Sequence, residues 1–300
     1  MEEKHFYHLY ANGDDAQNFI TSEKEFKTAF NRFGVCQNAT GVRIASFSIE
    51  DSHPHALIYG TFLQCRTFLK LFEGISLRSI VQNRGSLDGV RLKCVLSEIS
   101  DSSYLMNVGT YTIVQATKDG KSVMPYDYLY GTGALYFRSS NCILPWLMDE
   151  RGNVCKPVRF DTLTSREKKK LCASRYSIPD DWLICNGFIL PSNYVDIPLF
   201  ESIYKTHNCF RFFMCRGRKS DEEIMSRMAQ TREVALEDLA ARKLCEEACE
   251  KLLGRKTLKY ATLEQRIRIA QLLRSSYRMA YRQLRALTYL PESELRKYVK

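Results

Sequence analysis

Two extended segments joined by a three-residue link limit what this chain can fold into. The first, residues 42–49, alternates apolar and polar side chains as a half-buried strand does. The link Glu50-Asp51-Ser52 leads directly into the second, residues 53–60. A link this short allows only antiparallel pairing, because a parallel neighbour needs a crossover of about a dozen residues. We therefore expect a β-hairpin near the start of the chain.

The segments around this hairpin predict an α+β fold. The expected elements, in order, are a strand at 5–10 with a turn at 11–15, a helix at 22–33 that Gly34 ends, the two hairpin strands, a helix at 62–81 and a strand at 91–99. This order is that of a ferredoxin-like antiparallel sheet with helices on one face.

The hairpin carries a possible metal site. Two of the five histidines, His53 and His55, stand two residues apart. On an extended strand this spacing points both imidazoles to the same side. Two neutral imidazoles can share one divalent ion if a third ligand comes from another element. The other interpretation is the polar face of an edge strand.

A further helix, from about Tyr104 to Lys118, carries a second candidate. Asp101-Ser102-Ser103 predicts its start and Gly120 its end. Its apolar stripe leaves Tyr111 and Gln115 one turn apart on a neighbouring face. They are a candidate nucleophile and a candidate metal ligand. A tyrosine hydroxyl simply satisfied by a glutamine is the alternative.

The rest of the chain predicts a connecting region and a basic helical region. We expect domains at 1–140, 141–220 and 221–300, the second irregular apart from helices at 165–173 and 197–205, and packed on the first. No window reaches the ~18 apolar residues of a membrane span. The eleven cysteines form no C-x-x-C pair and are typical of reduced thiols. We expect a cytoplasmic protein.

Positive charge is concentrated in the last fifty residues. Residues 251–300 contain thirteen Lys and Arg and three Glu, a net charge of +10 that equals that of the whole chain. Helices are expected at 221–253, 262–274, 280–287 and 291–299, and the last two fit a helix-turn-helix. We predict DNA contacts from Arg282, Arg285, Arg296 and Lys297. A solvated helical face is the alternative.

Taken together, these motifs resemble the REP-associated tyrosine transposases of bacteria, which are HUH single-strand DNA nucleases with one catalytic tyrosine. The resemblance rests on His53-Pro54-His55 after a first strand and helix, and on the later Tyr111-x-x-x-Gln115. Gly120 and the segment 125–128 also match, and the similarity covers about residues 5–140, with a looser match at 281–284. Pro54 departs from the bulky apolar residue of the family, and Ser52 from its frequent asparagine.

The resemblance implies the HUH nuclease fold and a transesterification on single-stranded or hairpin DNA. His53, His55 and Gln115 would hold Mg²⁺ or Mn²⁺, and Tyr111 would attack the scissile phosphate. We expect no nucleotide cofactor and no membrane partner, and a monomer or homodimer. Two alternatives stay open: a domesticated relative that binds DNA without cleaving it, and a rolling-circle replication initiator, although no nucleotide-binding G-x-x-x-x-G-K-[ST] motif is present.

Overall fold

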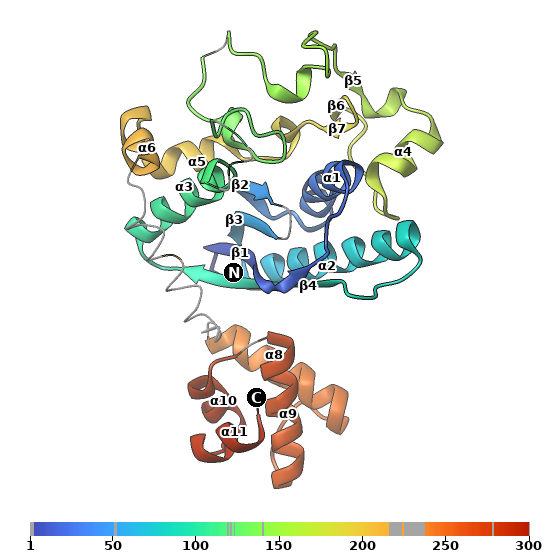
Figure 1. Ribbon diagram of the computed structural model, residues 1–300. Coiled ribbons are helices and arrows are strands. Elements are labelled where there is room, and N and C mark those ends of the chain that lie inside the picture. Colours follow the sequence, from blue (N-terminus) through green and yellow to red (C-terminus); the bar gives the residue numbers. More distant parts are fainter. Residues whose placement is uncertain are drawn as a thin grey trace. The chain divides into compact units, whose positions relative to one another are not determined.

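The computed structural model of the chain divides into two compact units, residues 1–222 and 223–300 (Figure 1). The structure describes residues 3–50, 53–118, 120, 122, 124–139, 141–215, 224, 238–277 and 279–299. The expected domain boundary at 220/221 lies outside these residues. The expected division at residue 140 stays a prediction.

The first unit is built on a four-stranded antiparallel sheet with the strand order β2-β3-β1-β4. The chain forms it in the predicted order of strand, helix, strand, strand, helix, strand, and the hairpin of β2 and β3 is confirmed. The elements are β1 (His5–Gln17), α1 (Glu23–Thr40), β2 (Arg43–Ile49), β3 (Pro54–Gly60), α2 (Phe62–Arg84), β4 (Arg91–Ile99) and, after the sheet, α3 (Ser102–Lys118).

Strand β1 is longer than the sequence indicated. The prediction of a turn at 11–15 is wrong, because β1 continues to Gln17. Its pairing with β4 shifts register between Ala11 and Ala16 and then resumes at Ala16 opposite Leu92. An irregularity of this kind takes up extra polar residues without ending the ladder.

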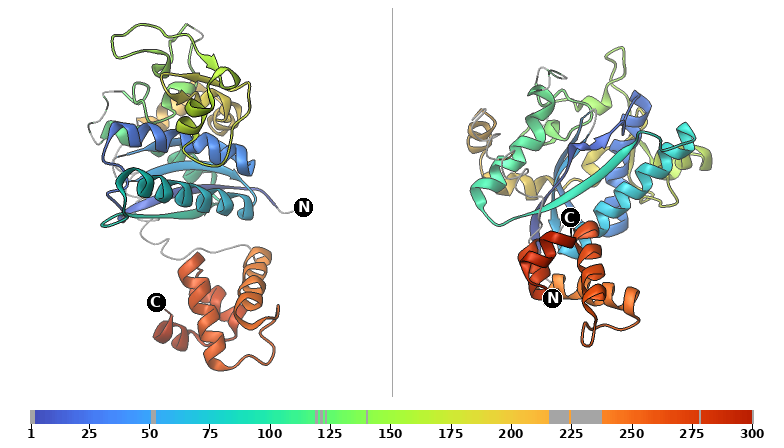
Figure 2. Two further views of the ribbon diagram at one scale, coloured as in Figure 1. Left: turned by 90° about the vertical axis from the view of Figure 1, so that its right-hand side faces the viewer. Right: turned by 60° about the horizontal axis from the view of Figure 1, so that its bottom comes forward.

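Helices α1 and α2 cover one face of the sheet with aromatic side chains. Phe33 of α1 stacks on Phe47 of β2 with ring centroids 4.1 Å apart, and lies 4.8 Å from Phe72 of α2. Ser22 caps the start of α1, and Thr61 with Gln64 forms a capping box at the start of α2. Helix α3 lies on the opposite side of the sheet, as the right-hand view of Figure 2 shows.

The prediction that Gly34 ends α1 is wrong. The helix continues to Thr40, and Gly41 ends it in the left-handed conformation at φ +68°. Gly34 instead lies where another part of the chain approaches closely. A Cβ atom there would be 2.9 Å from the ring of Tyr194, which stacks on Trp182. The glycine therefore serves packing, a purpose that local sequence does not reveal.

The elements that follow α3 pack on the first part of the chain: α4 and β7 on α1, α5 on β2 and α3, and α6 on α3. Helices α4 and α5 confirm the two that were predicted here, but the small sheet of β5, β6 and β7 was not expected, because strands of two or three residues show no alternation. The Asn31 amide of α1 donates to Gly187 O (2.8 Å) and accepts from Ile189 N (2.9 Å). The elements are η1 (Gly133–Leu135), η2 (Pro145–Leu147), β5 (Val158–Arg159), η3 (Phe160–Thr162), α4 (Ser165–Cys172), β6 (Leu183–Cys185), β7 (Phe188–Ile189), η4 (Pro191–Asn193), α5 (Ile197–Tyr204) and α6 (His207–Met214).

The second unit is a small helical bundle. Its helices are α8 (Asp238–Leu253), α9 (Leu263–Tyr277), α10 (Tyr281–Thr288) and α11 (Glu292–Tyr298). The last three confirm the predicted spans to within a few residues. Of the helix expected at 221–253, α8 confirms residues 238–253, and most of residues 221–237 lie outside the described residues. Of the helices that the structure describes, none has the length and apolar character needed to cross a bilayer.

The close approach at Gly34 predicts a packing penalty. The substitution Gly34→Ala should destabilise the protein by about 1–3 kcal/mol, because the new methyl group meets the Tyr194 ring. Gly74→Ala is the matched control: Gly74 lies inside α2 with its nearest neighbouring atom 3.9 Å away, so alanine should stabilise by about 0.5–1 kcal/mol. Urea unfolding of both variants checks this, and equal effects would contradict it.

The ion pair between Glu25 and Arg84 predicts a pH dependence of stability. Burial raises the pKa of Glu25, but hydrogen bonds from Arg84 and Thr21 outweigh it and lower the pKa from 4.5 to about 2. A carboxyl group with a lowered pKa stabilises the fold above its unfolded pKa and loses that effect as pH falls towards the folded value.

Glu25→Gln should therefore cost about 1–2 kcal/mol at pH 7, a figure reduced for the partial solvation of the pair. The difference between the two proteins should shrink as pH falls from about 5 to about 2. Thermal unfolding across this range measures it. A difference that stays constant with pH would show that the carboxylate charge of Glu25 has no part in stability.

Candidate active site

The face of the sheet beneath α3 is polar, although it is buried. Tyr10 of β1 lies opposite His55 of β3, so both side chains point to the same side, together with His8 two residues earlier. On the neighbouring strand Ser48 lies opposite His55, and Ser46 shares its face. All five residues are buried. This face therefore concentrates imidazole and hydroxyl groups, whereas the opposite face is aromatic.

Helix α3 is held to this face by a buried hydrogen bond. The Ser46 and Thr112 hydroxyl oxygens are 2.6 Å apart, and the Thr112 hydroxyl is 2.9 Å from Gly109 O of its own helix. From the other side, the Tyr204 hydroxyl donates to Met106 O at 2.6 Å. These contacts set the position of Tyr111, which is adjacent to Thr112.

The structure brings Tyr111 to the predicted histidine strand. Its ring centroid is 5.2 Å from that of His55 and 6.3 Å from that of His8, each ring edge-on to the tyrosine. Tyr111 is 6% exposed and His55 is fully buried. Two residues fifty-six positions apart in the chain, selected from separate motifs, thus lie against each other.

His53 lies just before β3. Its ring centroid is 4.9 Å from that of His55. Its Nε2 lies 3.8 Å from a carboxylate oxygen of Glu50, and its side chain is 22% exposed, against 1% for Glu50. His53 is therefore the solvent-facing end of the cluster.

Pro54 occupies a position that tolerates proline. It is the first residue of β3, where it lies opposite Ile49, and the pairing of β3 with β1 begins one residue later at His55. A proline at the start of a strand removes no hydrogen bond from the interior of a ladder. The departure from the family pattern at Pro54 thus leaves the sheet intact around both imidazoles.

Gln115 lies one turn beyond Tyr111 on α3, half-buried. Its amide oxygen is buried and makes no hydrogen bond with the residues that the structure describes, and the same holds for His55 Nε2. An imidazole nitrogen and an amide oxygen are donor types that Mg²⁺ or Mn²⁺ accepts. These buried atoms therefore fit the proposed ion chemically. Within the described residues, no three His, Cys, Asp or Glu side chains are grouped as metal ligands.

Sequence reasoning missed His8. Its Nε2 lies 3.3 Å from His55 Nδ1, and the two rings stack with centroids 5.5 Å apart. Burial lowers the pKa of His8 to about 3, and burial followed by the neighbouring His53 and His8 lowers the pKa of His55 well below its usual value. Both rings are thus neutral. The only sequence signal for His8 was its place in the alternating strand β1. That signal does not identify His55 as its partner until the register of β1 and β3 is known.

Glu50 was also missed as a site residue. It was interpreted only as part of the hairpin link, yet its side chain is buried beside His53. A carboxylate three residues before a His-x-His pair is a signal that could have been used.

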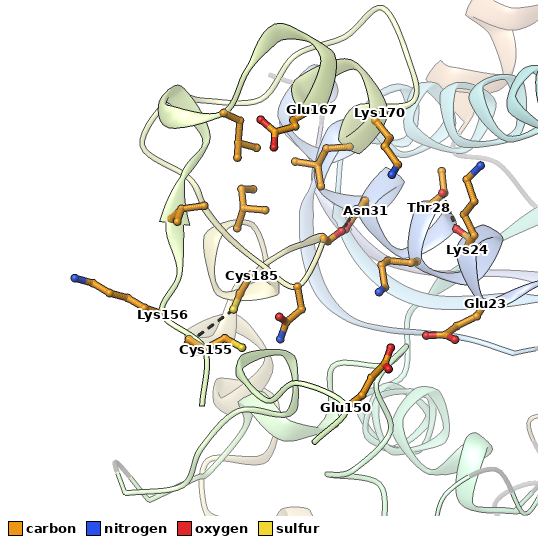
Figure 3. Close-up of a pocket in the computed structure, with 17 residues that line it drawn as sticks. Glu23, Lys24, Thr28, Asn31, Glu150, Cys155, Lys156, Glu167, Lys170 and Cys185 are labelled. Atoms are coloured by element: carbon orange, nitrogen blue, oxygen red, sulfur yellow. Dashed lines mark hydrogen bonds between the residues drawn. The ribbon is translucent and has the colours of Figure 1, made fainter. Parts of the chain in front are cut away.

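A pocket lies elsewhere, between α1, α4 and the small sheet (Figure 3). It has a volume of about 700 Å³, and none of its lining residues belongs to the predicted site. Its lining carries both signs of charge: Lys24, Lys27, Lys156 and Lys170 with Glu23, Glu150 and Glu167. The Glu167 carboxylate is already engaged by Thr164 at the start of α4.

In the second unit, α10 and α11 are joined by a tight turn at Tyr289 and Leu290. The four predicted DNA contacts, Arg282, Arg285, Arg296 and Lys297, are exposed. The Arg296 guanidinium is paired with Glu292 at 2.6 Å and lies 4.9 Å from the centre of the Tyr281 ring. The geometry is that of two short helices with basic side chains on their surface.

Comparison with known proteins adds little. No protein-family model and no curated protein matches the chain. Among solved structures, the chain is similar to a REP-associated tyrosine transposase bound to a REP hairpin, with 12% sequence identity over 43% of this chain and 75% of that one. The TM-score is 0.31, a value that does not by itself establish a shared fold.

The bond between Ser46 and Thr112 predicts coupled mutational effects. Thr112→Val should destabilise by about 1–3 kcal/mol, because the Ser46 hydroxyl stays buried without this partner. Ser46→Ala combined with Thr112→Val should cost less than the sum of the single changes, by about 1 kcal/mol. Denaturant unfolding of the three variants measures the coupling. Strict additivity would contradict it.

Proposed function

We propose that the first unit cleaves and rejoins single-stranded DNA next to a hairpin through a covalent tyrosine intermediate. The observation that carries the proposal is the contact of Tyr111 with His55, since it joins the nucleophile and ligand motifs that the sequence suggested independently. The proposed fold class is the HUH nuclease fold, which the antiparallel sheet order supports.

Tyr111 is the proposed nucleophile. Its phenolic oxygen attacks phosphorus, the bond from phosphorus to the 3′ oxygen breaks, and the products are a 5′-phosphotyrosine and a 3′-hydroxyl. The phenol proton leaves Tyr111, and the 3′ oxygen gains one. One phosphate ester bond is exchanged for another, so the step needs no external energy. The reverse attack by a 3′-hydroxyl rejoins the strand. A buried tyrosine on a rigid helix suits this role because its direction of attack is set in advance.

His53, His55 and Gln115 are the residues that would hold Mg²⁺ or Mn²⁺. When bound, such an ion polarises and orients the scissile phosphate. The neutral state of His55 supports its assignment as a ligand, since a protonated imidazole cannot bind a metal. His8, packed on the far nitrogen of His55, would orient that ring. The exposed edge of His53 is the proposed side from which DNA enters.

The basic second unit would add affinity without sequence preference. Arg282, Arg285, Arg296 and Lys297 are proposed to contact phosphates, and binding through them should weaken steeply as salt is raised.

A second candidate is a non-catalytic DNA-binding protein that retains the fold. The observation that favours it is the burial of the cluster: His8 and His55 are fully buried and Tyr111 is 6% exposed. A phosphodiester must reach the Tyr111 hydroxyl to be attacked, and a closed, well-packed cluster is also what a purely structural role produces.

Adduct formation with DNA distinguishes the two candidates. The protein is incubated with Mn²⁺ and labelled hairpin oligonucleotides that carry single-stranded flanks, and a denaturing gel should show a covalent protein–DNA species. Tyr111→Phe should abolish it, because phenylalanine has no oxygen to attack phosphorus. Tyr104→Phe, at another buried tyrosine of α3, should leave it unchanged.

Removing the metal ion tests the proposed ligands in the same adduct assay. EDTA should eliminate the adduct, and added Mn²⁺ should restore it. Binding of the oligonucleotide without an adduct under every condition would favour the non-catalytic candidate, whereas an adduct that survives Tyr111→Phe would refute the assignment of the nucleophile.

A further inference from the structure

Two tyrosines of the second unit have an unusual backbone conformation and an unusual exposure. Tyr260, between α8 and α9, has φ +63°, and Tyr289, between α10 and α11, has φ +57°. They are also 81% and 76% exposed, more than any other large hydrophobic side chain that the structure describes. Both turns therefore present an aromatic ring to solvent.

Folding does not explain either exposed ring, although the left-handed conformation of Tyr289 ends α10, with its N–H donating to Arg285 O (3.0 Å). The left-handed region disfavours side chains with a Cβ atom, and a bulky residue there is uncommon, since glycine or asparagine fits at lower cost. An exposed ring regains little of this cost because it buries little apolar surface. A strained conformation that packing does not repay is evidence for a functional role of the side chain.

One arginine holds both turns. The Arg266 guanidinium donates to Leu258 O (3.3 Å) and Ala261 O (3.1 Å), on either side of Tyr260, and to Thr288 O (2.9 Å), directly before Tyr289. Three carbonyl acceptors on one rigid donor bring the two turns next to each other. The two turns thus lie side by side, and we term Tyr260, Tyr289 and the cations beside them the paired-tyrosine surface.

Positive charge accompanies each ring. The Lys259 amine lies 5.2 Å from the centre of the Tyr260 ring, and the Arg266 guanidinium lies 5.6 Å from that of Tyr289. Arg285 lines a hollow of about 500 Å³ together with Tyr289. The segment 251–300 has a net charge of +10. The surface is therefore complementary to a polyanion that also offers flat rings.

We propose that the paired-tyrosine surface binds a single nucleic-acid strand by stacking its unpaired bases on Tyr260 and Tyr289, with the neighbouring cations on its phosphates. Stacking on exposed aromatic side chains is tolerant of sequence and needs base faces that a duplex keeps covered. A duplex read by α10 and α11 alone would involve base edges and phosphates. Duplex binding through these two helices would leave the exposed ring of Tyr260, which lies before α9, without a role.

The proposal depends on the second unit and not on the chemistry of Tyr111. It is tested with the full-length protein in EDTA, so that binding alone is measured. Fluorescence anisotropy compares a labelled dT 20-mer and rU 20-mer, which distinguish DNA from RNA as the source of the strand, with a 20-base-pair duplex.

Tyr260→Ala and Tyr289→Ala should each weaken single-strand binding about tenfold, whereas the phenylalanine variants should bind as the wild type does. Duplex affinity should not change. Tyr176→Ala is the matched control, because Tyr176 also has a cation over its ring, Arg175 at 5.3 Å, but lies in the first unit. It should leave all affinities unchanged.

Glycine variants separate function from stability. Tyr260→Gly and Tyr289→Gly should weaken single-strand binding as alanine does, yet raise the melting temperature above that of the alanine variants, because glycine relieves the left-handed backbone. Unchanged single-strand affinity would overturn the proposal, as would an equal loss of duplex affinity. Adduct formation by Tyr111 is measured separately. It shows whether the proposed function holds when the proposal for the paired-tyrosine surface fails.

Discussion

The pairing of β1 with β3 through the middle of the sheet is the constraint on which the first unit depends. Its register places Tyr10 opposite His55, and strand alternation then puts His8 on the same side. A slip of one residue would move every imidazole to the aromatic face beneath α1 and α2. The same register buries Leu9 and Ala56 on that aromatic face. One set of backbone hydrogen bonds thus builds the core and gathers the histidines.

The cost of burying this polar face is reduced by a hydrogen bond and by the neutrality of two imidazoles. Ser46 and Thr112 satisfy each other, and the lowered pKa values of His8 and His55 keep both rings uncharged in a medium that disfavours ions. A neutral, desolvated imidazole beside a tyrosine suits both a metal site and a well-packed core. The proposed attack by Tyr111 would require DNA to reach this cluster, in which His53 is the partly exposed histidine.

The second unit carries its candidate binding residues on its surface and not in a buried cluster. Its core is formed by helices, and its surface has two exposed tyrosines with left-handed backbone, in turns that the hydrogen bonds of Arg266 join. Basic residues and exposed rings are arranged there independently of the sheet. If both proposals hold, the first unit supplies reaction chemistry and the second supplies affinity for unpaired strands, each through its own residues.

The sequence by itself determined the order of the elements up to α3, the hairpin, and the choice of His53, His55, Tyr111 and Gln115, because strand alternation, helix caps and short-range spacing are local properties. It did not predict the small sheet of β5, β6 and β7, whose strands are too short to alternate. The ends of β1 and α1 were not predicted, since β1 continues past a register shift and α1 runs through Gly34 to its cap at Gly41. The role of Gly34 depends on the Tyr194 ring from a distant segment. Only the tertiary structure decided that His8 lies 3.3 Å from His55 and that Arg266 joins two tyrosine turns. Such pairs are set by strand register and helix packing, which join residues that no local pattern connects.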